Sequence, residues 1–116
     1  MSDIENLSPE QFLARLKFDD HGLIPAIIQD AGDGAILMLG YMNRESIAMT
    51  LEKQKVTFWS RSRQVFWTKG ETSGNFLELV AMAGDCDGDA LLVTAKAYGP
   101  TCHTGKRSCF SWRLNQ

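Results

Sequence analysis

Long apolar runs are missing from this sequence. No stretch approaches the roughly 18 consecutive apolar residues of a membrane-spanning helix, so we expect no membrane partner. The opening residues, MSDIENLSPE, are acidic and polar instead of basic and then apolar, which is not the pattern of a secretory signal peptide. These absences together predict a cytoplasmic protein.

A strong net charge is missing too. The 12 Lys and Arg residues nearly balance the 14 Asp and Glu residues, which leaves a formal net charge of −2. So small a charge produces no field that attracts nucleic acid, and the basic residues form no continuous stripe. We therefore expect no nucleic-acid partner. Two short basic clusters, at 61–63 and 106–107, are compatible with a small phosphorylated ligand.

Cysteine is scarce and odd in number. The three thiols are Cys86, Cys102 and Cys109, and an odd count in a reducing compartment argues against a disulfide framework. A single cysteine is more often a small buried apolar residue than a ligand, and the C-x6-C spacing is looser than that of zinc fingers. Three thiolates nevertheless match a catalytic zinc site, which has three protein ligands and leaves one position for water.

Repeats, linkers and low-complexity segments are absent as well, so the 116 residues predict a single domain, 1–116. Apolar and β-branched runs bounded by turn residues predict six strands, at 24–30, 35–42, 56–60, 65–70, 76–83 and 90–98. The segment 99–112 is rich in glycine and polar residues, which predicts a loop.

The sequence predicts the first residues of two helices. Ser8 and Gln11 form a capping box for a helix at 8–16, and Asn43 can cap a second helix at 44–54. Two helices and about six strands indicate an α+β fold built on a mostly antiparallel β-sheet roll.

The stretch GDCDGDA, residues 84–90, crowds Asp85, Asp87 and Asp89 at alternate positions. One interpretation is a solvated hairpin, because Asp-Gly between apolar strands is typical of a type I′ turn. An EF-hand loop does not match, since its sixth and twelfth positions would hold alanine and lysine. The other interpretation is a magnesium site, in which carboxylates around a tight turn meet one hard cation.

Cys86 lies between the first two of these aspartates. Side chains alternate in an extended segment, so Cys86 would point away from both neighbours and would allow a second, soft site on the other face. A type I′ turn would change this geometry, and both arrangements stay open at this point.

The two histidines receive different interpretations. His103 adjoins Cys102, and histidine as a residue type suits an acid or base beside a metal-bound water, because imidazole exchanges protons near neutral pH. Two alternatives stay open: a fourth zinc ligand, although neighbouring residues rarely converge on one tetrahedral metal, and a loop histidine with a hydrogen-bonded ring. We assign no function to His21.

Several motifs in order resemble the phosphoribosyl-AMP cyclohydrolase family of histidine biosynthesis. They are SRSR, KGETSGN, DCDGDALL and GPTCHTGKRSCF, and PAIIQD and LMLGYMNRES fit the same family. The resemblance covers roughly residues 20–111, since any one motif is modest support but all of them in order are specific. The family also occurs fused to a pyrophosphohydrolase domain, and this chain looks like the monofunctional form.

The resemblance implies an intertwined homodimer with one Zn²⁺ per subunit at the interface. Cys86 matches a ligand from one subunit, and Cys102 and Cys109 match the two ligands from its partner. The three aspartates 85, 87 and 89 match the Mg²⁺ ligands, and His103 matches a histidine implicated in catalysis.

The implied activity is hydrolytic opening of the N1–C6 bond of 1-(5-phosphoribosyl)-AMP by zinc-activated water. The product is the formimino-aminoimidazole carboxamide ribonucleotide of the third step of histidine biosynthesis. Guanidinium groups and loop donors suit the two phosphates of this substrate, and the candidates are Arg61, Arg63, Thr72, Ser73, Gly74, Lys106 and Arg107. Trp59 and Trp67 are interpreted as core aromatics of strands rather than base-stacking platforms.

Two other classes of protein compete with this interpretation. A zinc-stabilised binding module would use the cysteines only to support its fold. A deaminase would act on a similar ring, but its H-x-E…P-C-x-x-C signature is absent.

Overall fold

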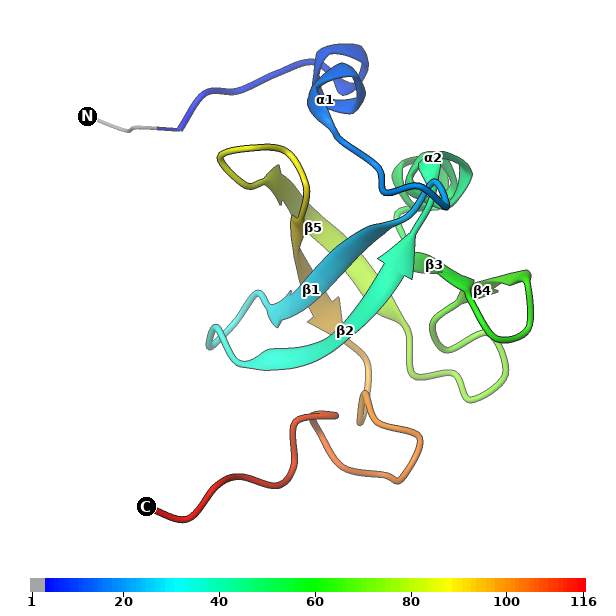
Figure 1. The fold of residues 1–116 in the computed structure, drawn as a ribbon. Coiled ribbons are helices and arrows are strands. Elements are labelled where there is room, and N and C mark those ends of the chain that lie inside the picture. Colours follow the sequence, from blue (N-terminus) through cyan, green and yellow to red (C-terminus); the bar gives the residue numbers. More distant parts are fainter. Residues whose placement is uncertain (1–3) are drawn as a thin grey trace.

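The computed structural model describes residues 4–116, and Figure 1 shows how its elements are arranged. Within this range the elements follow one another as α1 (Pro9–Arg15), β1 (Ile24–Asp30), β2 (Ile36–Met42), α2 (Arg44–Lys53), β3 (Thr57–Ser60), β4 (Val65–Thr68), β5 (Leu77–Gly84) and β6 (Leu91–Ala97). Each lies close to its predicted bounds, which confirms the two helices, the six strands and the α+β class.

Four of the strands form one sheet in the order β2-β1-β6-β5. β1 pairs with β2, and β5 with β6, in antiparallel hairpins, whereas β1 and β6 run parallel. β3 and β4 form a separate antiparallel hairpin. The predicted antiparallel character is confirmed, and the parallel pair is an addition that joins segments far apart in the sequence.

Both helices begin as their first residues predict. Ser8 accepts a hydrogen bond from the N–H of Gln11 at 3.2 Å, and the Gln11 side chain accepts one from the N–H of Ser8 at 3.1 Å. Asn43 and Ser46 make the same reciprocal pair at α2, with distances of 2.8 and 2.9 Å. Such caps satisfy N–H groups that have no partner inside the helix.

The hydrophobic core lies on one face of the sheet, which α2 and the β3–β4 hairpin cover. Alternate residues of β1 and β6 point into it, as the period of two in a strand requires. The largest fully buried apolar side chains are Phe58, Ile24, Ile28, Leu37, Met42, Ile47, Leu77, Leu91, Val56 and Val93. This core fixes the positions of the strand ends, where the candidate functional residues lie.

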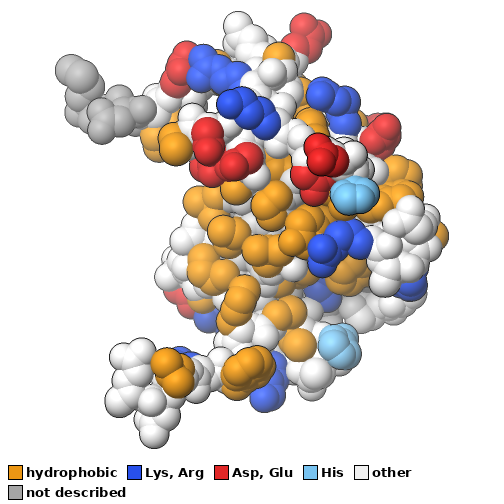
Figure 2. Space-filling view, in the orientation of Figure 1, with side chains coloured by type: hydrophobic (Ala, Val, Ile, Leu, Met, Phe, Trp, Pro, Cys, Tyr) orange, Lys and Arg blue, Asp and Glu red, His pale blue; other side chains and the backbone are white. Residues whose placement is uncertain are grey.

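The opposite face of the sheet carries an apolar row that reaches solvent. Leu39 pairs with Ile27, Ile27 with Leu92, and Leu92 with Ala83, so these side chains share one face across all four strands. Leu39 is 43% exposed and Leu92 39% exposed. In Figure 2 hydrophobic side chains gather over the middle of the molecule, between α1 and the C-terminal segment. Contiguous exposed apolar surface of this kind marks an interaction site.

Helix α1 rests on the turn between β5 and β6. The carbonyl of Gly88 accepts a hydrogen bond from the N–H of Lys17 at 2.8 Å. Gly88 has φ +76°, and a Cβ placed there would lie 2.4 Å from the carbonyl oxygen of Arg15. Only glycine meets both conditions, so the close approach of α1 depends on this one residue.

Replacing Gly88 with alanine should therefore destabilise the fold more than its backbone angle alone explains. Gly22 is the matched control, because it has the same φ of +76° and no atom lies within 4 Å of the position that a Cβ would take there. Left-handed strain should cost both variants about 1–2 kcal/mol, and the clash with Arg15 should cost Gly88→Ala roughly 1–3 kcal/mol more. Urea unfolding measures both, and equal losses would show that α1 does not need this contact.

Candidate active site

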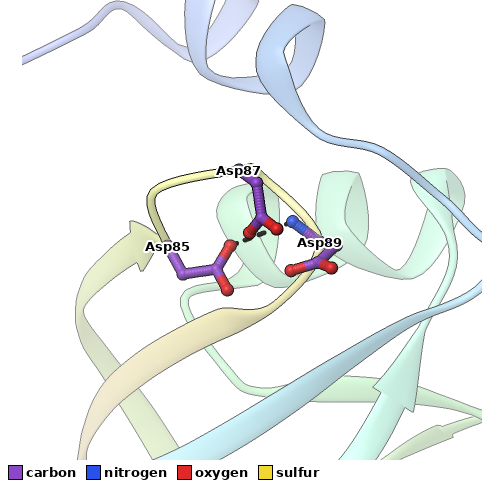
Figure 3. Close-up of side chains that lie close together, drawn as sticks. All are labelled: Asp85, Asp87 and Asp89. Atoms are coloured by element: carbon purple, nitrogen blue, oxygen red, sulfur yellow. Dashed lines mark hydrogen bonds between the residues drawn. The ribbon is translucent and has the colours of Figure 1, made fainter.

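The three carboxylates of the acidic turn come together. One ligand oxygen from each of Asp85, Asp87 and Asp89 lies within 4.8 Å of the other two, and all three residues are exposed (Figure 3). The carboxylate of Asp85 accepts the N–H of Asp89 at 3.0 Å and that of Ala90 at 3.2 Å. The turn thus gathers oxygen ligands of the kind that a hard cation such as Mg²⁺ prefers.

The turn is not of type I′. That turn needs positive φ at both central residues, but between β5 and β6 only Gly88 has a positive φ. The N–H of Gly88 binds the carbonyl of Asp85 and the N–H of Asp85 binds the carbonyl of Ala90, each at 3.1 Å. The predicted Asp-Gly hairpin is therefore correct, but its two-residue loop is wrong. A longer loop leaves room for three carboxylates on one side.

The crowding of these acids shifts the pKa values of Asp85 and Asp89 in opposite directions. The nearby carboxylates of Asp87 and Asp85 raise the pKa of Asp89. At Asp85 desolvation by itself raises the pKa, but hydrogen bonds from Asp89 and Ala90 outweigh it, so the pKa of that carboxyl is lowered. One acid of the group therefore resists ionisation, which is the expected result of like charges held together. A bound cation would relieve this repulsion.

The C-terminal loop brings two of the three thiols together. Cys102 is half-buried, and its sulfur accepts a hydrogen bond from the Thr104 hydroxyl at 3.0 Å. That bond, followed by a weaker contribution from Cys109, lowers the pKa of Cys102. Burial, and then the neighbouring Cys102, raises the pKa of Cys109. A thiol pair of this kind fits two ligands of a soft metal such as Zn²⁺.

The third thiol lies at the other end of the sheet. Cys86 is exposed in the turn before β6, and Cys102 follows the end of β6. A strand of seven residues spans roughly 20 Å, and in 4–116 only the three aspartates form a group of three possible metal ligands. One chain therefore supplies the predicted zinc ligands in two separate parts.

Two ion pairs of Arg107 and three hydrogen bonds attach the thiol loop to the β1–β2 hairpin. Arg107 binds the carboxylate of Asp33 at 2.8 Å and lies 3.5 Å from that of Asp30. The Ser108 hydroxyl donates to the carbonyls of Ile36 and Leu37, and the N–H of Cys109 also donates to Leu37. The guanidinium of Arg107 is thus engaged in attachment, and its contact with a phosphate stays a prediction. Sequence reasoning missed Asp33, because a lone turn aspartate gives no signal of so distant a partner.

One large cavity brings His103 beside two of the predicted arginines. It has a volume of 880 Å³, and its lining includes His103, Arg61 and Arg63, together with Tyr41, Ser60, Ser62, Trp59 and Trp67. The guanidinium of Arg61 lies 3.8 Å from the centre of the Tyr41 ring. A space of this size suits a nucleotide, and its polar groups are few and convergent.

The two tryptophans of this cavity have a double role. Trp67 packs against Phe58 with ring centres 5.5 Å apart, and Trp59 meets Phe66 edge-on at 5.0 Å. Both are only half-buried and line the cavity as well. Both lie in strands as predicted, but only Trp67 packs against the core, and the prediction missed their contact with the open space.

The remaining predicted contacts lie elsewhere. Thr72, Ser73 and Gly74 are exposed in the loop after β4 and do not line the large cavity. Lys106 is exposed in the thiol loop and helps to lower the pKa of Cys102. Lys69 was missed by sequence reasoning: it is only 7% exposed, and its charge partly opposes the rise that burial and Cys102 cause in the pKa of Cys109. No helix among residues 4–116 has the length and apolar character to cross a membrane.

This α+β domain combines clustered carboxylates, paired thiols and a nucleotide-sized cavity beside a histidine, which is typical of a hydrolase. A family model described as "Phosphoribosyl-AMP cyclohydrolase" matches residues 38–111. Curated relatives agree over most of the chain. Phosphoribosyl-AMP cyclohydrolase from Roseobacter denitrificans is 57% identical over 111 residues, covering 95% of this chain and 87% of the relative.

Two further relatives give the same result. The enzyme of that name from Ruegeria pomeroyi is 59% identical over 95 residues, covering 82% of this chain and 80% of the relative. That from Chlorobium phaeovibrioides is 50% identical over 107 residues, covering 92% and 78%. The chain belongs to the phosphoribosyl-AMP cyclohydrolase family.

Replacing Asp33 with asparagine should loosen the thiol loop without unfolding the domain. Hydrogen exchange at the N–H groups of Cys102 and Cys109, which bind Lys106 and Leu37, should become several-fold faster. Asp20→Asn is a control at an exposed acid outside these contacts. Unchanged exchange in Asp33→Asn would show that the ion pair does not hold the loop.

The same variant gives a pH dependence whose sign follows from the ion pair. Arg107 holds the pKa of Asp33 well below its ordinary value of 3.8. The loop stabilisation should therefore be complete above about pH 4 and disappear as the pH falls further, because protonation removes the charge. As the pH falls below about 4, the difference in exchange rate between the wild type and Asp33→Asn should therefore decrease and finally vanish.

Proposed function

We propose that the chain hydrolyses the N1–C6 bond of 1-(5-phosphoribosyl)-AMP, the third step of histidine biosynthesis. The family match over 38–111 supports the substrate and the reaction, because that range contains the acidic turn, the thiol loop and most of the cavity lining. The 880 Å³ cavity beside His103 supports it independently. The free thiols agree with a reducing, cytoplasmic setting.

The substrate chemistry sets what the protein must do. Substitution at N1 draws electrons from the ring, so C6 is electrophilic. A water oxygen adds to C6, the N1–C6 bond breaks, and the oxygen stays on C6 as that of a carboxamide. No group leaves, so the reaction needs one proton removed from water and one delivered to N1.

His103 is the group that moves this proton. It lies in the loop with the two thiols and faces the large cavity. Its imidazole accepts the proton of the attacking water and returns it to N1, a role that contributes about 10²–10⁴ in rate. Arg61 and Arg63 hold a phosphate at the same cavity, since guanidinium forks match phosphate oxygens.

Cys86, Cys102 and Cys109 would hold Zn²⁺, and the three aspartates would hold Mg²⁺. The thiols and the gathered carboxylates are ligand types that fit a soft and a hard cation respectively. A zinc ion at the thiols would supply a water whose pKa is lowered to about 7. A magnesium ion would orient a polar part of the substrate.

The zinc site is shared between the subunits of a homodimer. Two observations support this proposal: the thiols of one chain lie at opposite ends of β6, and an apolar row covers the exposed face of the sheet. A second copy would bring its Cys102 and Cys109 to Cys86 of the first. Two equivalent sites would follow from the twofold symmetry.

Replacing His103 with asparagine should lower kcat by about 10²–10⁴ while zinc content stays unchanged. The measurement is an ultraviolet assay of ring opening with phosphoribosyl-AMP, with and without a zinc chelator. His21→Asn is the matched control, because that exposed histidine lines a different cavity. Full activity in His103→Asn would contradict the assigned role. Release of ammonia would indicate a deaminase, and absence of chelator-sensitive ring opening would contradict the proposed reaction.

Mixing two inactive variants tests the shared site. Cys86→Ser and Cys109→Ser should each lack activity, because each removes a ligand from both sites of its own dimer. After subunit exchange each heterodimer retains one intact site, so random mixing should restore about a quarter of wild-type activity. No recovery despite demonstrated exchange would place all three ligands within one chain.

A further inference from the structure

The C-terminal segment 110–116 leaves the domain with its apolar side chains uncovered. Phe110 is 64% exposed, Trp112 92% and Leu114 79%. The segment has no helix or strand, and in Figure 1 it extends away from the sheet at the end opposite α1. Three large apolar residues at alternate positions form one side of an extended chain. Such a side is rarely left in water without a partner.

A groove beside Cys86 presents the complementary surface. It has a volume of 470 Å³ and lies between the segment before α1, α1 itself and the end of β5. Its lining combines apolar side chains with Cys86, Asp85 and the ion pair of Arg15 and Glu5; the apolar residues are Ile4, Leu7, Phe12, Leu16, Met82 and Ala83. Leu16 is 8% exposed and Phe12 is half-buried, so the walls are set by the core.

We propose that the C-terminal segment of a second copy of this chain docks in this groove, with Trp112 as its anchor. The inference rests on the proposed function, because the shared zinc site fixes where that segment begins. Two thiolates on one zinc ion lie about 4 Å apart, since each Zn–S bond is about 2.3 Å. Phe110 directly follows Cys109, and consecutive Cα atoms are about 3.8 Å apart. Phe110 of the partner subunit must therefore lie close to Cys86.

The surroundings of Cys86 decide where the segment then goes. The acidic turn that holds Cys86 presents three exposed carboxylates, which offer nothing to an apolar side chain. The groove also borders Cys86, and there it offers the apolar side chains of Phe12, Leu16 and Met82. Phe110, Trp112 and Leu114 share one side of an extended chain, so they can enter the groove together while Ser111 and Arg113 face solvent. The tail of one subunit thereby covers the zinc ligand of the other.

Photocrosslinking tests the position of the anchor directly. A benzophenone amino acid replaces Trp112, and isotopically heavy and light subunits are mixed so that crosslinks between chains are recognised by mass. We expect heavy–light crosslinks to Phe12, Leu16 or Met82. The same probe at Arg113 is the control and should give few of them. Crosslinks confined to one chain, or to another surface, would overturn the proposal.

Association supplies a second measurement that does not depend on activity. Trp112→Ala should weaken dimerisation by at least about 30-fold, as expected of a buried aromatic anchor, whereas Arg113→Ala should change it little. Sedimentation of the zinc-loaded protein measures both, and equal affinities of Trp112→Ala and wild type would overturn the docking.

The result is separable from that of the proposed function. If mixed cysteine variants regain activity but crosslinks miss the groove, the shared site stands and the docking is wrong. If mixing fails but crosslinks between chains reach Phe12 or Met82, the docking stands and the shared zinc site is wrong.

Discussion

The pairing of β6 with strands on both of its sides is the constraint on which the rest of the structure depends. β6 bonds in parallel to β1 and antiparallel to β5, and alternate residues Leu91, Val93 and Ala95 are buried in the core. Both flanks of the strand are therefore fixed, and neither end can shift without breaking a ladder of hydrogen bonds. The acidic turn enters β6 and the thiol loop leaves it.

The strand β6 separates two groups of candidate ligands. The carboxylates are gathered at one end and two thiols at the other, so a single chain holds its hard and soft ligand sets apart. Cys86 lies beside the carboxylates but offers a soft ligand. Cys86 is thus separated from Cys102 and Cys109 by the length of β6. This separation agrees with the exposed apolar row across the sheet, which also lacks a covering element among the described residues.

Local signals in the sequence predicted most of the fold. The capping residues Ser8, Gln11 and Asn43 and the alternating apolar runs depend on near neighbours, so they can be recognised without tertiary information. The parallel β1–β6 pair was not predicted, because nothing in either strand names a partner so distant in the chain. The predicted type I′ turn at Gly88 was wrong, and the loop found there also contacts the end of α1, which lies far away in the sequence.

The candidate site was predictable to a similar extent. The acidic turn, the thiols and His103 stand in motifs that are specific when taken together. Their roles toward metals rest on that resemblance. The contacts that hold the site in place were not predicted. Asp33 holds the thiol loop through Arg107, and Trp59 both packs in a hairpin and lines the cavity. Such supporting contacts join segments whose separate compositions look ordinary.

The contact between α1 and Gly88 also affects the order in which the chain can fold during synthesis. α1 has only seven residues and buries none of them fully, and so short a helix is marginal in water by itself. Its docking surface, the turn at Gly88, leaves the ribosome long after the helix does. The N-terminal segment must therefore wait, unfolded, until the β5–β6 hairpin has emerged. The contact between α1 and Gly88 therefore forms only after the acidic turn has folded.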